Sequence, residues 1–456
     1  MKRTTFHAVI ILALLLMMVS TVATAAPAIK KIGINVVLNT EVTDAILADL
    51  GTHGKVFNKI VEIDAVTMMI PATELPIIQA LPYVKAAGPD QERNGSPIDT
   101  VEATSFANGI NTWDLDAVNV TNLGSGRVTD YDGTGVYVAV LDTGLVDSWR
   151  QYFPQERIAE EFAIAFGGGG GEMGVVSSQP NKWEHDQNSH GTHVTSTILG
   201  YSMRGTPVNG VAPMATVIPV KVLNQNGSGW SSVVAAGIVY VTDLKVDGKL
   251  GNSPVVINMS LGGPSLDAME QAAVDYAVEN GVIIVASAGN EGTAGMGYPG
   301  AYAPVISVAA SGWVGEWKSG TWWYATDVPD PTNADDFYIT DFSSRALAGQ
   351  DLDVAAPGSW IVGPYQVNSG QISYYFLGGT SMSSPHVAGI VALMLQKDPS
   401  LTANDAELAL EDSAIPLPAG CRDIIDPNVG LTEVCWEADA TGAGLATADA
   451  ALNAIP

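Results

Sequence analysis

The strongest constraint on the fold is a series of short apolar runs that alternates with helical patterns after residue 136. Helical patterns occupy residues 230–244 and 265–281, where Ser265 is placed to cap its helix and Gly281 to end it. Apolar runs of this length are typical of strands buried on both faces. Their alternation with helices predicts an α/β fold of three layers, with a mostly parallel central sheet between helices. The predicted strands are residues 136–142, 215–223, 255–261, 281–289, 305–310 and 352–358.

Polar residues follow several of these strands, where active sites of such sheets gather. Asp142 ends the run VYVAVLD, and Asn290 follows the run that ends in ASAG. Ser381 lies in GGTSMSSPHVAG, between a strand-like YYFL and a helical run. The pattern places Ser381 at a helix N-terminus, where unpaired N–H groups favour a negative oxygen. We expect Pro385 in the first turn of this helix, where its missing N–H costs little.

The histidines near these motifs fall into different classes. His190 and His193 lie three residues apart on one helical face, a spacing that two metal ligands could share. Neither H-E-x-x-H nor its inverse occurs, which argues against a zinc protease, and no metal site is predicted. We interpret His193 and His386 as buried side chains bonded to backbone carbonyls, and His185 as part of a polar loop.

Residues 1–26 have the pattern of a secretory signal peptide. Lys2 and Arg3 precede an apolar run at 8–19, and Ala-Thr-Ala follows at 23–25. The apolar run is short for a membrane span, although an uncleaved anchor is the alternative. No other long apolar run follows, so a secreted protein without membrane attachment is predicted.

Residues 27–98 predict a small α+β domain of their own. The pattern is strand, helix, two strands, helix and strand. Residues 94–109 are polar and lack a clear period, which predicts an exposed linker. We therefore divide the chain into 27–98, a linker at 99–109 and a large domain at 110–456.

Three segments resemble the subtilisin-like serine proteases, the subtilases. They are VAVLDTG around Asp142, HGTHV from His190 and GTSMSSPHVAG around Ser381, and their order is that of subtilisin. GVAPMATVIPVKVL, INMSLGG, ASAGNEG and VAAPG resemble further blocks of the family, in sequence. The resemblance covers roughly residues 110–451. It implies the subtilisin-like three-layer fold and a serine endopeptidase that needs no cofactor for its chemistry.

The chemistry of peptide cleavage explains these residue types. A serine hydroxyl is a poor nucleophile unless a nearby imidazole takes its proton, the roles that the resemblance gives to Ser381 and His190. A carboxylate, here Asp142, must orient the ring and stabilise the imidazolium. Asn290 resembles the family's oxyanion-hole asparagine, whose amide binds the oxygen of the tetrahedral intermediate.

The resemblance also implies a cleft for an extended protein or peptide substrate. Hydrogen bonds to the backbone on both sides of a peptide would bind peptides of any sequence. Gly297 matches the floor of the first specificity pocket, which predicts cleavage after large apolar or aromatic residues, and Glu291 on the rim could also admit Lys or Arg. The predicted edge residues are Gly227, Ser228, Gly229, Ser260, Leu261 and Gly262.

The unit at 27–98 resembles the inhibitory propeptide of the family, with a separate binding domain as the alternative. It implies a zymogen that cuts itself between residues 90 and 108, with its own propeptide as intramolecular inhibitor. Structural calcium is possible with unknown ligands: residues 200–210 lack a good oxygen set, and the acidic insert at 325–338 is a candidate. We expect a monomer.

The net charge limits the kinds of partner that this protein can bind, and the two cysteines bear on the compartment in which it acts. The formal net charge of −28 lies almost wholly after residue 99, and such a surface repels nucleic acid and anionic membranes. Cys421 and Cys435 are the chain's two cysteines, and export makes a disulfide between them plausible, with two buried thiols as the alternative. In the chain-entropy model, a disulfide that closes a loop of this length stabilises the folded state by about 3 kcal/mol.

Two other functions fit parts of the sequence. An inactive subtilase-like binding protein would not need Asp142, His190, Asn290 and Ser381 together. An esterase of the α/β-hydrolase type requires G-x-S-x-G and the order serine, acid, histidine. Ser383 stands where that motif requires glycine, and the order here is acid, histidine, serine.

Overall fold

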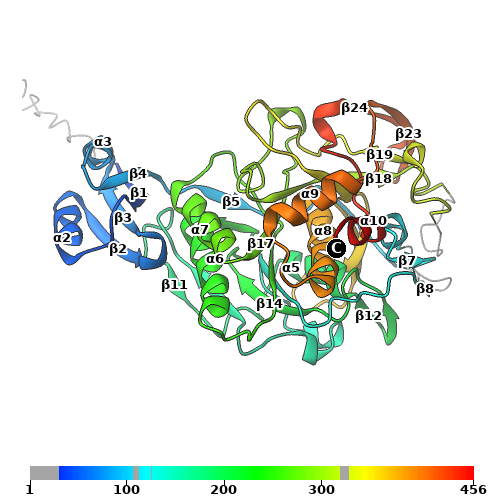
Figure 1. Cartoon of the computed structure of the whole chain (residues 1–456), viewed down its shortest axis with the longest axis horizontal. Coiled ribbons are helices and arrows are strands. Elements are labelled where there is room, and N and C mark those ends of the chain that lie inside the picture. Colours follow the sequence, from blue (N-terminus) through cyan, green and yellow to red (C-terminus); the bar gives the residue numbers. More distant parts are fainter. Residues whose placement is uncertain (1–29, 105, 107–111, 125, 319–327) are drawn as a thin grey trace, which may run out of the picture.

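A nine-stranded sheet forms the centre of the protein in a computed structural model that describes residues 30–104, 106, 112–124, 126–318 and 328–456 (Figure 1). The inner strands pair in parallel, and the strands at the two edges pair antiparallel. The predicted parallel sheet is thus confirmed. In spatial order the strands are β11 (Ser177–Ser178), β10 (Ile164–Gly167), β14 (Thr216–Lys221), β9 (Tyr137–Asp142), β16 (Val255–Met259), β17 (Val282–Ser287), β18 (Ile306–Trp313) and β19 (Phe337–Ile339), with β20 (Val354–Pro357) also paired to β18.

Helices cover both faces of this sheet and make it the middle of three layers. The helices α6 (Ser231–Val246) and α7 (Ala268–Glu279) pack on one face, and α5 (His190–Leu199) and α8 (Thr380–Lys397) pack on the other. Successive side chains of a strand point to opposite faces. In β9, Val138 and Val140 accordingly join the core beneath α8, whereas Ala139 and Leu141 join the core beneath α6. Two shorter helices follow, α9 (Ala403–Ser413) and α10 (Ala448–Ala454), and α10 packs against both α8 and α9.

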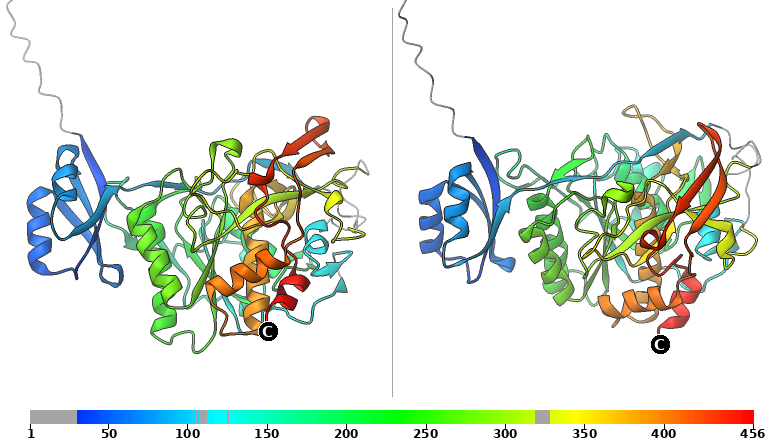
Figure 2. Two further views of the ribbon diagram at one scale, coloured as in Figure 1. Left: turned by 45° about the horizontal axis from the view of Figure 1, so that its top comes forward. Right: turned by 90° about the horizontal axis from the view of Figure 1, so that it is seen from above.

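The small N-terminal unit folds in the predicted order. Four antiparallel strands lie in the order β2-β3-β1-β4, and α2 and α3 accompany them. The unit stands at one end of the molecule, next to α6 and α7 (Figure 2). Its elements are β1 (Lys31–Leu38), α2 (Asp44–His53), β2 (Lys55–Ile60), β3 (Ala65–Pro71), α3 (Leu75–Gln79) and β4 (Val84–Pro89).

Alternation along β1 explains how the small unit docks. Ile34, Val36 and Leu38 point into its own core, which is closed by α2 and α3. Val37 points the other way and joins the core beneath α6 and α7. Asn35, on the same outer face, donates hydrogen bonds to Asp90 and to Asp267 at 3.0 Å each. One strand therefore supplies both the core of the small unit and its contact with the large one.

The polar segment after the small unit is not the free linker that its composition predicts. Residues 92–94 form β5 (Glu92–Asn94), which pairs with β15 (Ser228–Trp230). Residues 99–102 form β6 (Asp99–Glu102), which pairs with β22 (Tyr374–Gly378). The prediction of an exposed linker was wrong there because the hydrogen bonds of both strands are made with distant segments, so no local period marks them.

A hairpin near the C-terminus carries the predicted disulfide. β23 (Gly420–Asp426) and β24 (Gly430–Trp436) pair antiparallel, and Cys421 lies directly opposite Cys435. The two sulfurs are bonded. The bridge therefore joins strands that already face one another.

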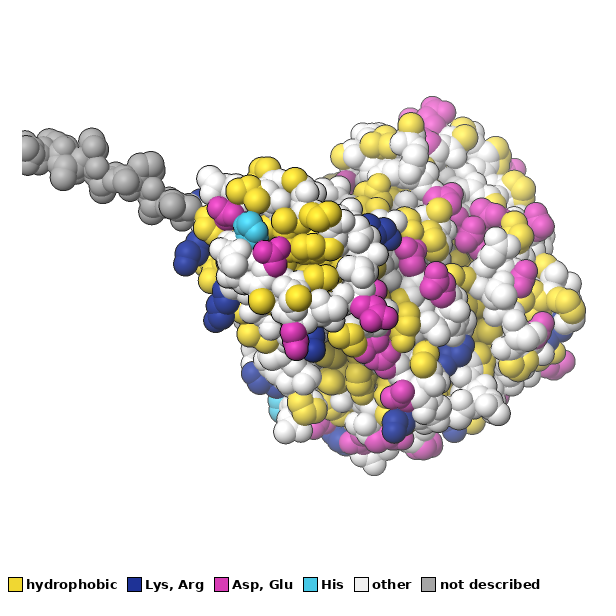
Figure 3. Space-filling model, turned by 60° about the vertical axis from the view of Figure 1, so that its left-hand side comes forward, with side chains coloured by type: hydrophobic (Ala, Val, Ile, Leu, Met, Phe, Trp, Pro, Cys, Tyr) yellow, Lys and Arg dark blue, Asp and Glu magenta, His cyan; other side chains and the backbone are white. Residues whose placement is uncertain are grey.

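Acidic side chains outnumber basic ones on the visible surface (Figure 3). Figure 3 views the molecule with the small unit in front, and Asp and Glu are spread over the visible part of the large unit with few Lys and Arg between them. This distribution agrees with the net charge of −28. Among the described residues, the helices are all too short or too polar to cross a membrane.

The start of α7 differs from the sequence prediction. The helix begins at Ala268, and its cap is Asp267 rather than Ser265. Asp267 Oδ1 accepts the N–H groups of Met269 and Glu270 at 2.9 and 3.1 Å. Ser265 lies outside the helix with its side chain exposed, so its resemblance to a cap was coincidental.

The corrected cap can be tested by substitution. Asp267→Ala should lower the free energy of unfolding by about 1 kcal/mol, because two N–H groups of α7 lose their acceptor. The measurement is unfolding in urea at pH 8, where the carboxyl is ionised although burial raises its pKa to about 6. Ser265→Ala is the matched control and should change the free energy by less than about 0.5 kcal/mol. Equal effects of the two changes would contradict the assignment.

Candidate active site

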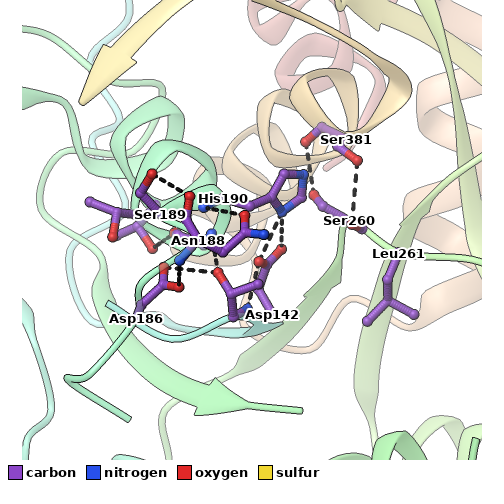
Figure 4. Close-up of polar contacts among 12 residues, drawn as sticks. Asp142, Asp186, Asn188, Ser189, His190, Ser260, Leu261 and Ser381 are labelled. Carbon is purple, nitrogen blue, oxygen red and sulfur yellow. Dashed lines mark hydrogen bonds and ion pairs between the residues drawn. The ribbon is translucent and has the colours of Figure 1, made fainter. Parts of the chain in front are cut away.

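Asp142, His190 and Ser381 meet at the carboxyl ends of the parallel strands (Figure 4). Asp142 is the last residue of β9, His190 the first of α5, and Ser381 the second of α8. The imidazole Nδ1 of His190 lies 2.9 and 3.0 Å from the two carboxylate oxygens of Asp142, and both side chains are fully buried. The ring stands between Asp142 and Ser381, and among the described residues its Nε2 has no hydrogen-bond partner.

The residues around this pair fix the position of the carboxylate. The N–H of Thr143 donates to Asp142 Oδ1 at 2.6 Å. Thr143 Oγ1 in turn accepts the N–H of Gly191 at 2.8 Å, which ties the start of α5 to the end of β9. A Cβ at position 191 would lie only 2.5 Å from the carbonyl oxygen of Gly144. The glycine after His190 is therefore required by the close approach of the two elements.

Two charged residues beside the pair were not found from the sequence. Asp186 accepts a hydrogen bond from Thr143 Oγ1 at 2.9 Å, and burial raises its pKa to about 6. Lys221 donates to the carbonyl oxygen of Thr143 at 2.5 Å, and burial lowers its pKa. Asp186 stands in a polar loop and Lys221 ends β14, and neither lies in a motif with a fixed spacing to Asp142. Only the folded chain brings them together.

Pro385 lies further inside α8 than predicted. The helix begins at Thr380, so the proline is its sixth residue and not part of the first turn. Proline has no N–H to donate to the carbonyl oxygen of Ser381, four residues earlier. The hydroxyl of Ser260 donates to that oxygen instead, at 2.8 Å. Ser260 thus anchors the beginning of α8 and the backbone of Ser381.

The side-chain hydroxyl of Ser381 and the amide of Asn290 face the same space. Ser381 Oγ donates to the carbonyl oxygen of Ser260 at 3.3 Å. Asn290 Oδ1 accepts the N–H and the hydroxyl of Thr380, both at 2.9 Å, which leaves the amide NH₂ directed away from Thr380. Ser381 and Asn290 both line a cavity of about 590 Å³.

The residues predicted for substrate contact border this cavity or the groove that leads into it. Gly297 and Gly262 line the cavity and lie against one another. Glu291 is also at its wall, where its Oε2 accepts the N–H of Asn290 at 2.7 Å. Leu261 differs, because its side chain is buried in the core and it does not line the cavity.

The groove is filled by the chain itself. β5 lies between β15 and Gly262, and Asn94 exchanges two backbone hydrogen bonds of 2.9 Å with Gly262. The N–H of Gly95 donates to the carbonyl oxygen of Gly227 at 2.9 Å. Ser228 pairs with Asn94 across the strands, and Gly229 pairs with Arg93. The two segments that were predicted to hold a peptide therefore hold residues 92–95.

The same segment continues past the buried histidine. A Cβ on Gly95 would lie 2.7 Å from the carbonyl oxygen of Ser260 and 3.4 Å from the His190 ring. Ser96 and Ile98 line the cavity together with Ser381. The N–H of Ile98 then donates to the carbonyl oxygen of Gly378 at 2.7 Å. Residues 92–95 are thus paired with the edges of the groove, and Ser96 is the next residue along the chain and lines the cavity. The peptide bond after Ser96 is therefore the first one beyond the paired residues and the cavity-lining residue that follows them.

The other histidines have the surroundings that the sequence predicts. His193 Nε2 lies 3.1 Å from the carbonyl oxygen of Ile361, and burial lowers its pKa to about 3. His386 Nδ1 lies 2.8 Å from the carbonyl oxygen of Met382, and its Nε2 lies 3.0 Å from Asp114. His185 is exposed.

One group of carboxylates within the described ranges could hold a cation. It consists of Asp351, Asp353 and Glu407, whose ligand atoms lie within 4.8 Å of one another. The predicted candidate at 325–338 lies partly outside the described residues, and the described part contains no such group. Asp353 is buried, and its Oδ2 accepts from the N–H and hydroxyl of Ser307.

Comparison with known proteins assigns the family. A profile of the subtilase family matches residues 133–447. The chain belongs to the subtilase family. Subtilisin DY from Bacillus licheniformis is 35% identical over 291 residues, which are 63% of this chain and 86% of that protein. Thermitase from Thermoactinomyces vulgaris is 33% identical over 59% of this chain and 89% of its own length.

Solved structures of other proteins share the fold of this chain. Fervidolysin from Fervidobacterium pennivorans, described as a keratinolytic enzyme related to subtilisin, matches 93% of the chain with a TM-score of 0.63 and 26% identity. This chain spans 61% of the length of fervidolysin. The S41 psychrophilic protease matches 75% of the chain and 99% of its own length, with a TM-score of 0.54 and 29% identity.

Family membership makes the chain a subtilisin-like serine endopeptidase, a hydrolase with the three-layer α/β fold. Subtilases need no cofactor for their chemistry, act on proteins and often bind structural calcium. The sequence-based assignment of the family is confirmed.

The carboxylate group at Asp353 makes stability depend on pH. Burial raises the pKa of Asp353 to about 8 and that of Glu407 to about 7. The folded chain therefore holds protons that the unfolded chain releases above about pH 4, and the free energy of unfolding should fall as the pH rises from about 4 to 8. Urea unfolding of the Ser381→Ala protein in EDTA measures this slope. Asp353→Asn, which keeps the acceptor for Ser307 without the charge, should reduce it, and an unchanged slope would contradict the prediction.

Proposed function

We propose that this subtilase is a secreted, self-processing endopeptidase whose catalytic residues are Asp142, His190, Ser381 and Asn290. One observation carries the proposal: the buried Asp142–His190 pair presents a free ring nitrogen towards Ser381, beside a groove that already holds an extended segment of chain. Geometry of this kind suits attack by a serine hydroxyl on a peptide carbonyl.

The first half of the reaction forms an acyl-enzyme. Ser381 Oγ attacks the carbonyl carbon, and His190 Nε2 takes the hydroxyl proton as the new C–O bond forms. Asp142 holds Nδ1–H and stabilises the positive ring. The former carbonyl oxygen becomes negative and accepts hydrogen bonds from the Asn290 amide and the N–H of Ser381. His190 then gives its proton to the leaving amine as the C–N bond breaks.

The second half returns the enzyme to its starting state. A water molecule takes the place of the amine, and His190 Nε2 accepts a proton from it as the oxygen attacks the ester carbon. The same oxyanion donors serve again. Collapse of this intermediate breaks the bond to Ser381 Oγ, which regains the proton from His190, and the carboxylic acid product leaves.

Substrates in this proposal are proteins that bind as extended strands between residues 227–229 and residues 260–262. Pairing through the backbone tolerates many sequences. The residue before the cut bond enters the cavity at Gly297, where the absence of a side chain leaves room for a large apolar group. Glu291 at the wall of the cavity would also allow Lys or Arg to bind there.

The small unit and its tail up to residue 96 act as the propeptide, after a signal peptide at 1–26 that lies outside the described residues. The small unit packs on α6 and α7, and its tail fills the groove, so the unit blocks other substrates until it leaves. We place the first cut after Ser96. The catalytic domain would then extend to residue 456 behind the short segment at 97–109, and act as a monomer outside the cell with no partner beyond substrate and propeptide.

Replacement of the nucleophile tests the assignment directly. Ser381→Ala should lower casein hydrolysis by a factor on the order of 10⁶, the size known for subtilisin itself, and leave the precursor uncut. N-terminal sequencing of the wild-type product should begin at Pro97. Ser383→Ala is the control in the same helix, because its hydroxyl has no hydrogen-bond partner among the described residues. Casein hydrolysis by Ser381→Ala at the wild-type rate would end the proposal.

The oxyanion role of Asn290 has a separate signature. Asn290→Ala should lower kcat by about 100- to 1,000-fold, the range for the equivalent donor in subtilisin, with KM changed only slightly. The physical reason is that the amide binds the negative oxygen, which exists only in the transition state and intermediate. Steady-state kinetics with a chromogenic peptide separate the two constants, and a loss confined to KM would contradict the role.

A further inference from the structure

A buried ion pair joins the segment in the groove to the enzyme domain. Arg93 of β5 and Glu270 of α7 are both fully buried. Arg93 Nη2 lies 2.6 Å from Glu270 Oε2, and Arg93 Nε donates to both carboxylate oxygens at 3.0 and 3.2 Å. The fork of the guanidinium thus binds the carboxylate through two nitrogens, the strongest common geometry for this pair.

The remaining donors of the arginine are also satisfied in the pocket. Arg93 Nη2 donates to the carbonyl oxygen of Ser265, and Nη1 donates to that of Glu92, both at 3.0 Å. A Cβ on Gly263 would lie 2.6 Å from Nη1, so glycine at this position leaves the space that the guanidinium occupies. The pocket is therefore shaped for a flat, charged group with several donors.

The acidic wall of the pocket belongs to the part of the chain that remains after processing. Glu270 lies in the first turn of α7, and Asp267, which caps this helix, is beside it. Both contribute attraction to the Arg93 guanidinium, Glu270 more strongly. When the small unit leaves, Arg93 leaves with it, and the two carboxylates stay with the groove. A peptide that fills the pocket excludes water from Glu270, and a buried carboxylate without a partner is costly, so the pocket favours a substrate with a cation there.

The position of Arg93 along the groove defines which substrate residue meets this pocket. Arg93 pairs with Gly229, Asn94 with Gly262, and Ser96 reaches the cavity at Ser381. Arg93 is thus the fourth residue before the bond that we propose is cut. Any peptide bound in the same register places its own fourth residue against Glu270, because backbone pairing fixes the register and not the side chain.

We propose that Glu270 makes this enzyme select substrates with arginine at the fourth position before the cut bond. The inference rests on the proposed function of the groove, and it names a substrate class within it. Arginine should exceed lysine, since only the guanidinium forms the two-nitrogen contact with the carboxylate. Neutral residues leave Glu270 without a counter-charge and should be cut more slowly.

Two quenched fluorescent peptides that differ in one residue test the proposal. Both contain Asn-Gly-Phe before the cut bond, and the residue ahead of Asn is either arginine or citrulline, its neutral isostere. For mature wild-type enzyme we expect kcat/KM to be about 10- to 100-fold higher with arginine. The ratio is taken on one enzyme preparation, so it does not depend on the amount of active enzyme.

The matching variant is Glu270→Met combined with Arg93→Met. The double change avoids an unpaired buried charge in the precursor, and the mature enzyme then differs from wild type only at residue 270. We expect its preference for arginine over citrulline to fall below about threefold. Glu279→Gln removes the same charge from the exposed far end of α7 and should keep the wild-type ratio.

The outcomes separate this inference from the proposed function. Equal hydrolysis of the two peptides by wild type would overturn the role of Glu270 while leaving an active endopeptidase. A preference that survives in the double variant would also overturn it. If the double variant fails to mature, the wild-type ratio decides alone. Failure of wild type to cut casein or either peptide would instead overturn the proposed function, and this inference with it.

Discussion

The buried contact between Asp142 and His190 is the interaction on which the site depends. A carboxylate without access to water is stable only when its hydrogen bonds are satisfied, and here they come from the imidazole and the N–H of Thr143. This requirement fixes the ring, and with it the direction of Nε2. Gly191 permits the approach of α5 to β9 that makes the contact possible. The proposed chemistry at Ser381 uses a geometry that these buried contacts impose.

The groove adds a second constraint, which is the pairing of backbone with backbone. β5 is held on one side by β15 and on the other by Gly262, so its register against Ser381 is set without any side chain. The enzyme can then distinguish one peptide from another only through the pockets that bind the peptide's side chains. Arg93 fills one such pocket and Ser96 reaches another. In the proposed zymogen, the segment that blocks the groove also displays how a substrate would lie in it.

Much of the fold could be predicted because its signals are local. Apolar runs such as residues 136–142 mark strands buried on both faces, and their alternation with helices leaves few alternatives to a parallel sheet. The site motifs were also visible, since glycines and polar residues stand at fixed positions after these strands. The errors concern contacts between segments that are distant in the sequence. Ser265 and Asp267 are both good caps, and only the structure shows that Asp267 caps α7 while it also accepts a hydrogen bond from Asn35 of the small unit. Pro385 was placed one turn too early because the hydroxyl of Ser260, which replaces its hydrogen bond, lies just after β16 and far away in the sequence.

The sequence by itself determined the family, the three-layer fold, the small N-terminal unit and the residues that face the cleft, because each is encoded by a run or motif a few residues long. Only the tertiary structure decided that residues 92–102 cross the cleft as strands, that Asp186 and Lys221 flank the Asp142–His190 pair, and that Glu270 holds Arg93. These features join segments up to about 280 residues apart. Their hydrogen bonds and charges are matched across space, and no local spacing in the sequence records such a match.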